Sequence, residues 1–339
     1  MPDLPTIWFI LVGVLLLGYA VLDGFDLGVG MLHFVVARDG AERRTLMRSI
    51  GPVWDGNEVW LLTMGGALFA AFPIVYATVF SGFYLALMLL LVALIGRAVA
   101  LEFRGHVDSP RWQMTWDVVF SVASTLAALL LGVAVGNVAA GVPISASGDY
   151  EGGLFGLLNP MGLSVGLLSL ALFATHGAIW LTTRTEGALL ARARRAAAIG
   201  WPLVGLAWLV VTGLAWFGEP HLRQNFDTPL AWIAPALFVA SLVGVAETVA
   251  RGAGTAAFVA SSLAIGGLVA TLGASLYPSL LPDAAGGIGL TVANAASSDL
   301  SLGVMLIIAL IGMPLVLGYT ALIYRRFWGP EPPGQEGGY

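Results

Sequence analysis

The sequence predicts an all-α integral membrane protein in which nine transmembrane helices form one bundle. Of its 339 residues, 58% are apolar and only 10% are charged, whereas a soluble domain carries about 25% charged residues. The mean hydropathy is +0.89. Long apolar segments recur along the chain, and a helix needs about 20 such residues to cross a bilayer. These observations exclude an ordinary soluble domain.

Nine apolar segments, separated by short polar or Gly/Pro-rich connections, supply the expected spans. The first apolar run is too long for a signal peptide and no basic residue precedes Arg38, so it is expected to be a span. These spans make residues 1–329 a single transmembrane domain, and the Pro/Gly/Glu-rich residues 330–339 a disordered cytoplasmic tail. The predicted spans are Ile7–Phe34, Val53–Phe72, Tyr76–Phe103, Met114–Val138, Gly162–Leu181, Ala197–Phe217, Leu230–Val249, Thr255–Leu276 and Leu302–Phe327.

The distribution of arginine predicts the orientation of the bundle. The chain has no lysine, so all 15 basic residues are arginine. With nine spans, 14 of these fall on one side of the membrane and Arg223 alone falls on the other. Because basic residues accumulate on the cytoplasmic side, we expect an external N-terminus, a cytoplasmic C-terminus and a multi-pass location in the bacterial inner membrane.

Composition also narrows the function classes. The absence of cysteine excludes disulfides, thiolate metal sites and cysteine nucleophiles. The 15 basic residues face 20 acidic ones without a basic stripe, so no nucleic-acid partner is expected. Of the four histidines, only His176 lies well inside a span, and no pair has metal-ligand spacing. We therefore expect no haem and no metal in this chain.

The first span carries two acids toward its cytoplasmic end, Asp23 and Asp26. Their i, i+3 spacing puts both carboxylates on one face of a helix. An ionised group at the bilayer centre costs roughly 2.5–3.5 kcal/mol on insertion scales, so such residues are usually functional or paired. The alternative is that the helix has already left the hydrocarbon, which would make both acids interfacial.

The second span begins with Trp54, Asp55, Asn57 and Glu58, and Trp60 follows. The two tryptophans are typical of a membrane interface. The two acids lie near the depth of the acids in the first span, or slightly outside it. Their spacing also fits a capping box at a helix N-terminus, so a structural role stays open for both.

Other charged residues occur at the ends of later spans. Arg97 and Glu102 lie near the end of the third span, and Asp117 lies near the start of the fourth. Arg97 either extends to the interface or pairs with a buried acid. Glu247 and Arg251, which are four residues apart in the seventh span, are expected to form a structural ion pair.

The acids of the first four spans therefore share the cytoplasmic half of the membrane, and the external half of those spans has none. Carboxylates that reach only partway into a membrane indicate a half-channel for protons, from the cytoplasm to a buried acceptor. The acids of this predicted pathway are Asp23, Asp26, Asp55, Glu58, Glu102 and Asp117.

Two long motifs and several shorter ones occur in a fixed order along the chain. The long ones are Gly18-Tyr-Ala-Val-Leu-Asp-Gly-Phe-Asp-Leu-Gly-Val-Gly-Met31 and Ser49-Ile-Gly-Pro-Val-Trp-Asp-Gly-Asn-Glu-Val-Trp-Leu-Leu62. The shorter ones are Gly65–Pro73, Phe80–Tyr84, Trp116-Asp117, Gly136-Asn137, Leu158–Pro160 and Asn294–Ser298. In this order they resemble subunit II of the cytochrome bd quinol oxidases over nearly the whole chain.

This resemblance implies a complex that oxidises quinol and reduces dioxygen to water, building a membrane potential without pumping protons. The partner would be a subunit I carrying two b-type haems, a d-type haem and the quinol site. A small single-span accessory subunit is a further expected partner. This chain would hold no haem and would not be catalytic alone. It would stabilise subunit I, contribute a cytoplasmic proton pathway and, as in some members, hold a structural quinone.

The resemblance associates the proton route with Trp54-Asp55 and with the acid of the first span, Asp23 or Asp26. Asp55 is then expected to take up the proton, and the two acids of the first span are expected to relay it. Glu58 and Asp117 would collect protons at the outer end of the route. Depth and charge alone assign Arg97, Glu102 and Asp117 to the route. The expected supporting residues are Trp54, Asn57 and Arg97.

One alternative from another class stays open, a standalone proton-coupled transporter. It predicts function without a partner and acids at mid-membrane in both halves of the chain. The second half lacks such acids apart from Glu247, which counts against it. The chain also lacks the long segment that larger relatives carry between the sixth and seventh spans, which leaves the structural quinone in doubt.

Overall fold

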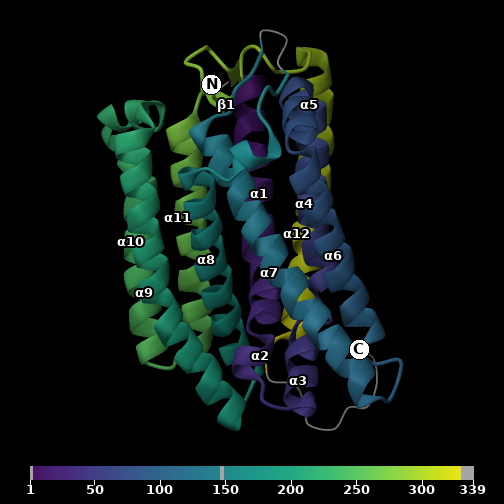
Figure 1. The fold of residues 1–339 in the computed structure, drawn as a ribbon. Coiled ribbons are helices and arrows are strands. Elements are labelled where there is room, and N and C mark those ends of the chain that lie inside the picture. Colours follow the sequence, from purple (N-terminus) through teal and green to yellow (C-terminus); the bar gives the residue numbers. More distant parts are fainter. Residues whose placement is uncertain (1–2, 146–148, 330–339) are drawn as a thin grey trace.

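The computed structural model describes residues 3–145 and 149–329, and the predicted tail at residues 330–339 lies outside these ranges. Long helices run side by side along one axis (Figure 1). The α-helices are α1 (Leu4–Met31), α2 (His33–Val36), α3 (Gly40–Ile50), α4 (Trp54–Ala71), α5 (Pro73–Gly82), α6 (Tyr84–Phe103), α7 (Pro110–Ala140), α8 (Pro160–Arg184), α9 (Gly187–Gly218), α10 (Ile233–Ala250), α11 (Gly254–Leu276) and α12 (Asp299–Phe327). The 3-10 turns are η1 (Leu154–Leu157), η2 (Pro220–Asp227) and η3 (Pro229–Trp232), and the strands are β1 (Ser279–Leu281) and β2 (Leu290–Thr291).

Eight helices in the described part of the chain are long and apolar enough to cross a membrane. The second expected span corresponds to α4, which is helical over 18 residues but is not among those eight. Its first turns carry Asp55, Asn57 and Glu58, and these polar residues lower its hydropathy. At 1.5 Å per residue a helix of this length spans about 27 Å.

Helix α1 lies in the middle of the bundle and contacts α4, α7, α8, α11 and α12. Glycines permit this close packing. A Cβ atom on Gly28 would lie 1.9 Å from the carbonyl oxygen of Phe173 on α8, and one on Gly18 would lie 2.0 Å from the Trp60 ring on α4. Small residues at such crossings let the backbones of membrane helices approach each other.

Three features depart from the predicted spans. The third expected span, Tyr76–Phe103, is divided at Phe83 into α5 and α6. An amphipathic helix, α3, follows the first span and begins at Asp39, whose carboxylate accepts hydrogen bonds from the amides of Ala41 and Glu42. A short antiparallel hairpin, β1–β2, occupies the connection before α12.

The buried apolar side chains form several clusters along the bundle rather than one core. The largest lies near α2, α3 and the C-terminal half of α8, with Phe25, Ile50, Phe120 and Trp180 among its members. Another lies near the hairpin and includes Trp8 and Phe72. The two clusters lie at opposite ends of the bundle, at the lower and upper ends of Figure 1.

Candidate functional site

A buried ion pair joins α1 to α6. The guanidinium of Arg97 donates through Nη1 to Asp23 Oδ2 over 2.8 Å and through Nη2 to Asp23 Oδ1. Both side chains are fully buried. Of the two alternatives for Arg97, extension to the interface is therefore wrong, and pairing with a buried acid is what the structure has. The bidentate geometry is the strong form of this interaction.

The second acid of α1, Asp26, is fully buried and lies in a different hydrogen-bond chain. Asn57 on α4 donates from Nδ2 to Asp26 Oδ2 over 2.8 Å and to the Leu22 carbonyl over 3.1 Å. The hydroxyl of Tyr324 on α12 donates to Asn57 Oδ1 over 2.9 Å. Asp26 Oδ1 has no hydrogen-bond partner among the described residues.

The first turns of α4 carry two more acids of the predicted proton route, Asp55 and Glu58. Asp55 is exposed and Glu58 is partly buried, and Glu58 interacts electrostatically with Arg97 and Asp23. The capping-box interpretation is wrong because the N-cap of α4 is Val53, and no side chain caps this helix. Asp55 still lies in the first turn, where the helix dipole favours a negative charge.

The two tryptophans of this segment are buried in the protein and do not lie on its surface. Trp54 is 9% exposed and Trp60 is 7% exposed. Trp54 belongs to the apolar cluster near α3, and the Trp60 ring fills the space above Gly18. Both pack inside the protein because α1 and α4 approach closely here, so they fix the position of the acids instead of anchoring the helix in lipid.

Asp117 lies in a separate cluster at the ends of α6 and α7. Its Oδ1 contacts His33 Nε2 at 2.7 Å and accepts a hydrogen bond from Arg104 Nε, while Oδ2 accepts from Arg43 Nε at 2.8 Å and from Arg104 Nη2 at 3.2 Å. Both oxygens are therefore occupied by donors. Glu102, by contrast, lies exposed near the end of α6.

The sequence-predicted residues therefore fall into two groups. Asp23, Asp26, Asn57, Glu58 and Arg97 converge where α1, α4 and α6 meet, with Asp55 on the outer side of α4. Asp117 and Glu102 are not part of that group. We call the first group the α1–α4–α6 charge cluster. Its members are the carboxyl groups of Asp23, Asp26 and Glu58, the guanidinium of Arg97 and the amide of Asn57, and Asp55 lies at its outer edge.

Sequence reasoning missed several members of both groups. Tyr324 lies 267 residues from Asn57, and no spacing links them. For Asp117 the sequence does indicate one partner. Arg104 precedes it by 13 residues, on the other side of the short α6–α7 connection, and opposite charges at the two ends of a helical hairpin can meet. Arg43 comes from α3, which was not predicted as a helix, and His33 lies at the end of the first predicted span, where the structure has α2.

His176, the one histidine within a span, has both ring nitrogens in hydrogen bonds. Nε2 lies 3.0 Å from the Val21 carbonyl, which can only accept, so Nε2 carries the hydrogen. Nδ1 then accepts from Ser261 Oγ at 2.7 Å. Occupied in this way, His176 is not placed to ligate an iron. Among the described residues no group of three or more His, Asp or Glu side chains could hold a metal ion.

A large apolar cavity lies between α1 and the helices α7 to α11. Its volume is about 600 Å³, and Phe173, Trp208, Trp216 and Trp232 are among its lining residues. Arg223 in η2, the arginine predicted to lie alone on the external side, also lines it. The cavity and the charge cluster occupy different parts of the bundle, but Tyr19 on α1 connects them. Its side chain lines the cavity and interacts electrostatically with Asp23.

The whole chain resembles known proteins of one family. The family model described as "Cytochrome bd terminal oxidase subunit II" matches residues 4–327. The cytochrome bd-I ubiquinol oxidase subunit 2 of Escherichia coli K12 is 38% identical, with 95% of this chain and 94% of that protein covered. The cytochrome bd ubiquinol oxidase subunit 2 of Bacillus subtilis is also 38% identical, with 96% of each chain covered.

The fold has a solved counterpart as well. A chain of the bd oxidase from Geobacillus thermodenitrificans superposes with a TM-score of 0.78 at 21% identity, covering 96% of this chain and 98% of that one. The two helical bundles therefore share their architecture although few residues are identical. With the family model matching almost every described residue, the chain belongs to the cytochrome bd terminal oxidase subunit II family.

Proposed function

We propose that this chain is the haem-free second subunit of a quinol:oxygen oxidoreductase in the bacterial inner membrane. The family model and the names of the relatives support a role in a cytochrome bd quinol oxidase complex. In that complex the haems, two of type b and one of type d, transfer electrons and bind dioxygen in a partner subunit I. An accessory single-span subunit belongs to the same proposal.

The proposed topology has nine spans within residues 1–329, with the N-terminus outside and the C-terminus in the cytoplasm. Counting α4 as a span is supported by its position in the bundle beside α1. The arginine-rich connections after α1, α6, α8 and α10 and the end of α12 lie at the lower end in Figure 1, opposite the hairpin β1–β2. This grouping supports the orientation inferred from arginine.

The face toward subunit I is proposed to include α4 and α12. On α12 only Leu302 is buried. On α4 the exposed residues include Asp55, Gly56, Thr63 and Gly66. Small and polar residues facing lipid would gain little, whereas they suit close packing against another membrane helix. A partner on this face would also cover Asp55. An ionised side chain at the membrane edge needs such shielding from lipid.

The proposed proton route starts at Asp55, passes Glu58 and reaches Asp26, and Asp23 lies beside it, held by Arg97. The observation that carries it is the buried carboxyl of Asp26, whose Oδ1 is free of partners among the described residues while Asn57 holds Oδ2. A carboxyl oxygen without a fixed donor can accept and release a proton through water. Asp117, with both oxygens held by cations, is proposed to be structural.

The apolar cavity is proposed to hold a structural quinone. Its volume of about 600 Å³ and its apolar, tryptophan-rich lining suit an isoprenoid chain. Phe173, Trp208 and Trp232 would contact that chain, and its quinone ring would serve as a structural filler rather than as an electron carrier. The transporter alternative is not favoured, because Glu247, the acid of the second half, pairs with Arg251 on an exposed helix face.

The route is tested by Asp55→Asn in the complex co-expressed with subunit I. We expect quinol-dependent oxygen uptake to fall about tenfold, which corresponds to about 1.4 kcal/mol in the rate-limiting barrier. The haem content should stay at the wild-type level, because Asp55 caps no helix and asparagine keeps its size and polarity. Asp108→Asn, an exposed acid in the α6–α7 connection at the same end of the bundle, is the matched control.

Unchanged oxygen uptake in Asp55→Asn would remove this residue from the route. A joint loss of haem content and oxygen uptake would instead assign Asp55 to assembly with subunit I.

A further inference from the structure

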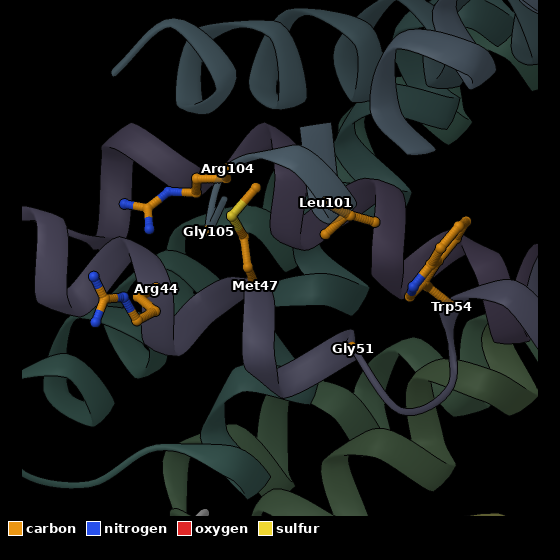
Figure 2. Close-up of a pocket in the computed structure, with 7 residues that line it drawn as sticks. All are labelled: Arg44, Met47, Gly51, Trp54, Leu101, Arg104 and Gly105. Atoms are coloured by element: carbon orange, nitrogen blue, oxygen red, sulfur yellow. The ribbon is translucent and has the colours of Figure 1, made fainter. Parts of the chain in front are cut away.

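A second, smaller pocket lies at the arginine-rich end of the bundle, outside the charge cluster and the apolar cavity. It is formed where α3 passes the end of α6 and the start of α4 (Figure 2). Its volume is about 30 Å³, and a cavity needs roughly 10–15 Å³ on this measure to hold one water-sized group. The pocket therefore has room for about two such groups. Its lining residues are Arg44, Met47, Gly51, Trp54, Leu101, Arg104 and Gly105.

One wall of this pocket is a fixed guanidinium. Arg104 is 4% exposed, and its Nε and Nη2 donate to Asp117 and to the Gly40 carbonyl. These bonds hold the guanidinium in one orientation and leave Nη1 for another acceptor. Asp117 is shared with Arg43, so one carboxylate faces two arginines and the wall keeps a net positive charge.

A second guanidinium lies beside the pocket. Arg44 is exposed on α3, and no carboxylate of the described residues pairs with it. The nearest acid in sequence, Glu42, bonds to Arg192 and to the amide of Arg38. In Figure 2 the side chains of Arg44 and Arg104 extend to the same side of the pocket. Both guanidiniums therefore lie on one side of the pocket (Figure 2), and Arg side chains bind phosphate oxygens well.

The floor of the pocket is apolar. Met47 and Leu101 are each 6% exposed, and Trp54 is 9% exposed. A free inorganic anion gains nothing from such a floor. A phospholipid does, because its glycerol and upper acyl carbons can lie on apolar side chains while its phosphate meets the arginines. Basic pockets between membrane helices on the cytoplasmic side are suited to anionic headgroups.

We propose that this pocket binds the phosphate of an anionic phospholipid of the cytoplasmic leaflet. Two phosphate oxygens enter between Arg44 and Arg104, and the glycerol rests against Trp54 and Leu101. The site ties α3 to the ends of α4 and α6. It does not depend on the proton route, since none of its lining residues carries a proton in that route.

The test uses the complex co-expressed with subunit I, purified in detergent and reconstituted with phosphatidylglycerol or phosphatidylcholine. Bound lipid is counted by native mass spectrometry. Arg44→Gln removes one guanidinium that has no described carboxylate partner, and Gly105→Leu fills the pocket without changing charge, because a Cβ on Gly105 meets nothing within 4 Å. Arg111→Gln, another exposed arginine at this end, is the matched control.

We expect Arg44→Gln to weaken phosphatidylglycerol retention about fivefold, the effect of one basic residue at an anionic surface. Gly105→Leu should lower it at least as much, Arg111→Gln should leave it unchanged, and phosphatidylcholine should bind weakly to all forms. The proposal is overturned if both pocket variants retain phosphatidylglycerol as the wild type does. It is also overturned if inorganic phosphate displaces the lipid as readily as phosphatidylglycerol itself, since the apolar floor would then contribute nothing.

Discussion

At the residue scale, the position of each acid decides what it can do. Asp23 is neutralised by a bidentate arginine, Asp117 is held by two arginines and a histidine, and among the described residues Asp26 is held only by the amide of Asn57. A carboxylate surrounded by charged donors is a poor proton carrier, because protonation would break several charge-assisted hydrogen bonds. Asp26 has one oxygen without a partner among the described residues, so protonation breaks fewer of its hydrogen bonds.

The pair of Asp23 and Arg97 makes a stability prediction. Both side chains are fully buried, so Arg97→Met leaves an uncompensated carboxylate in the membrane interior. The complex should lose about 3–5 kcal/mol, the usual cost of breaking a buried pair. The double variant Asp23→Asn with Arg97→Met should recover most of that loss, as followed by thermal unfolding in detergent.

A double-mutant cycle separates this pair from its surroundings. Equal destabilisation in the single and double variants would mean that Arg97 acts through packing and not through its charge on Asp23.

At the scale of elements, the crossing of α1 with α8 and α4 fixes the geometry of the charge cluster. The backbones of Gly28 and Gly177 touch, since a Cβ on Gly177 would lie 2.5 Å from the Gly28 carbonyl carbon. Both acids of α1 lie within the two helical turns that precede Gly28. Any shift of α1 would move Asp23 away from Arg97 and Asp26 away from Asn57.

Gly28→Val should therefore separate α1 from α8, because its Cβ would meet the Phe173 carbonyl oxygen at 1.9 Å. Overpacking typically costs about 1–3 kcal/mol, and a clash with backbone belongs at the upper end of that range. The yield of assembled complex and its thermal midpoint should fall. Gly13→Val on the same helix, where a Cβ meets nothing within 4 Å, should behave as the wild type; equal loss in both would refute the close-crossing argument.

Much of this element arrangement could be predicted from the sequence, because long apolar runs leave little choice but a membrane helix. The break at Phe83 and the hairpin β1–β2 were not predicted, since neither has a strong periodic or compositional signal. The amphipathic α3 was missed because it is short and polar beside the spans. Trp54 and Trp60 were assigned to the interface on residue type alone, although close helix packing buries both.

The candidate site was predictable only in part. Charge within an apolar span singles out Asp23, Asp26, Arg97 and Asp117 without any structure. The sequence does not tell which helix faces meet. Arg97 pairs with an acid 74 residues away, and Tyr324 reaches Asn57 from the last helix, so these partners follow from the packing of the bundle.

At the scale of the whole molecule, charge and empty space are separated. The charge cluster lies where α1, α4 and α6 meet, next to the exposed faces of α4 and α12 proposed for subunit I. The cavity of about 600 Å³ lies between α1 and the helices α7 to α11, and Tyr19 of α1 lines it. This division fits a subunit in which one half serves the partner and the other half is scaffold.

In the proposed mechanism, protons for dioxygen reduction pass Asp26, one of the two buried acids of α1. The most direct measurement is proton uptake during quinol oxidation by the Asp26→Asn complex in liposomes, with the haem spectrum recorded on the same sample. Asp117→Asn serves as the matched buried acid outside the route.

Asp26→Asn should slow oxygen-coupled proton uptake about tenfold and leave the haem spectrum as in the wild type. In Asp117→Asn the uptake per assembled complex should stay normal, even where less complex assembles. Wild-type uptake in Asp26→Asn, at full haem content, would contradict the claim.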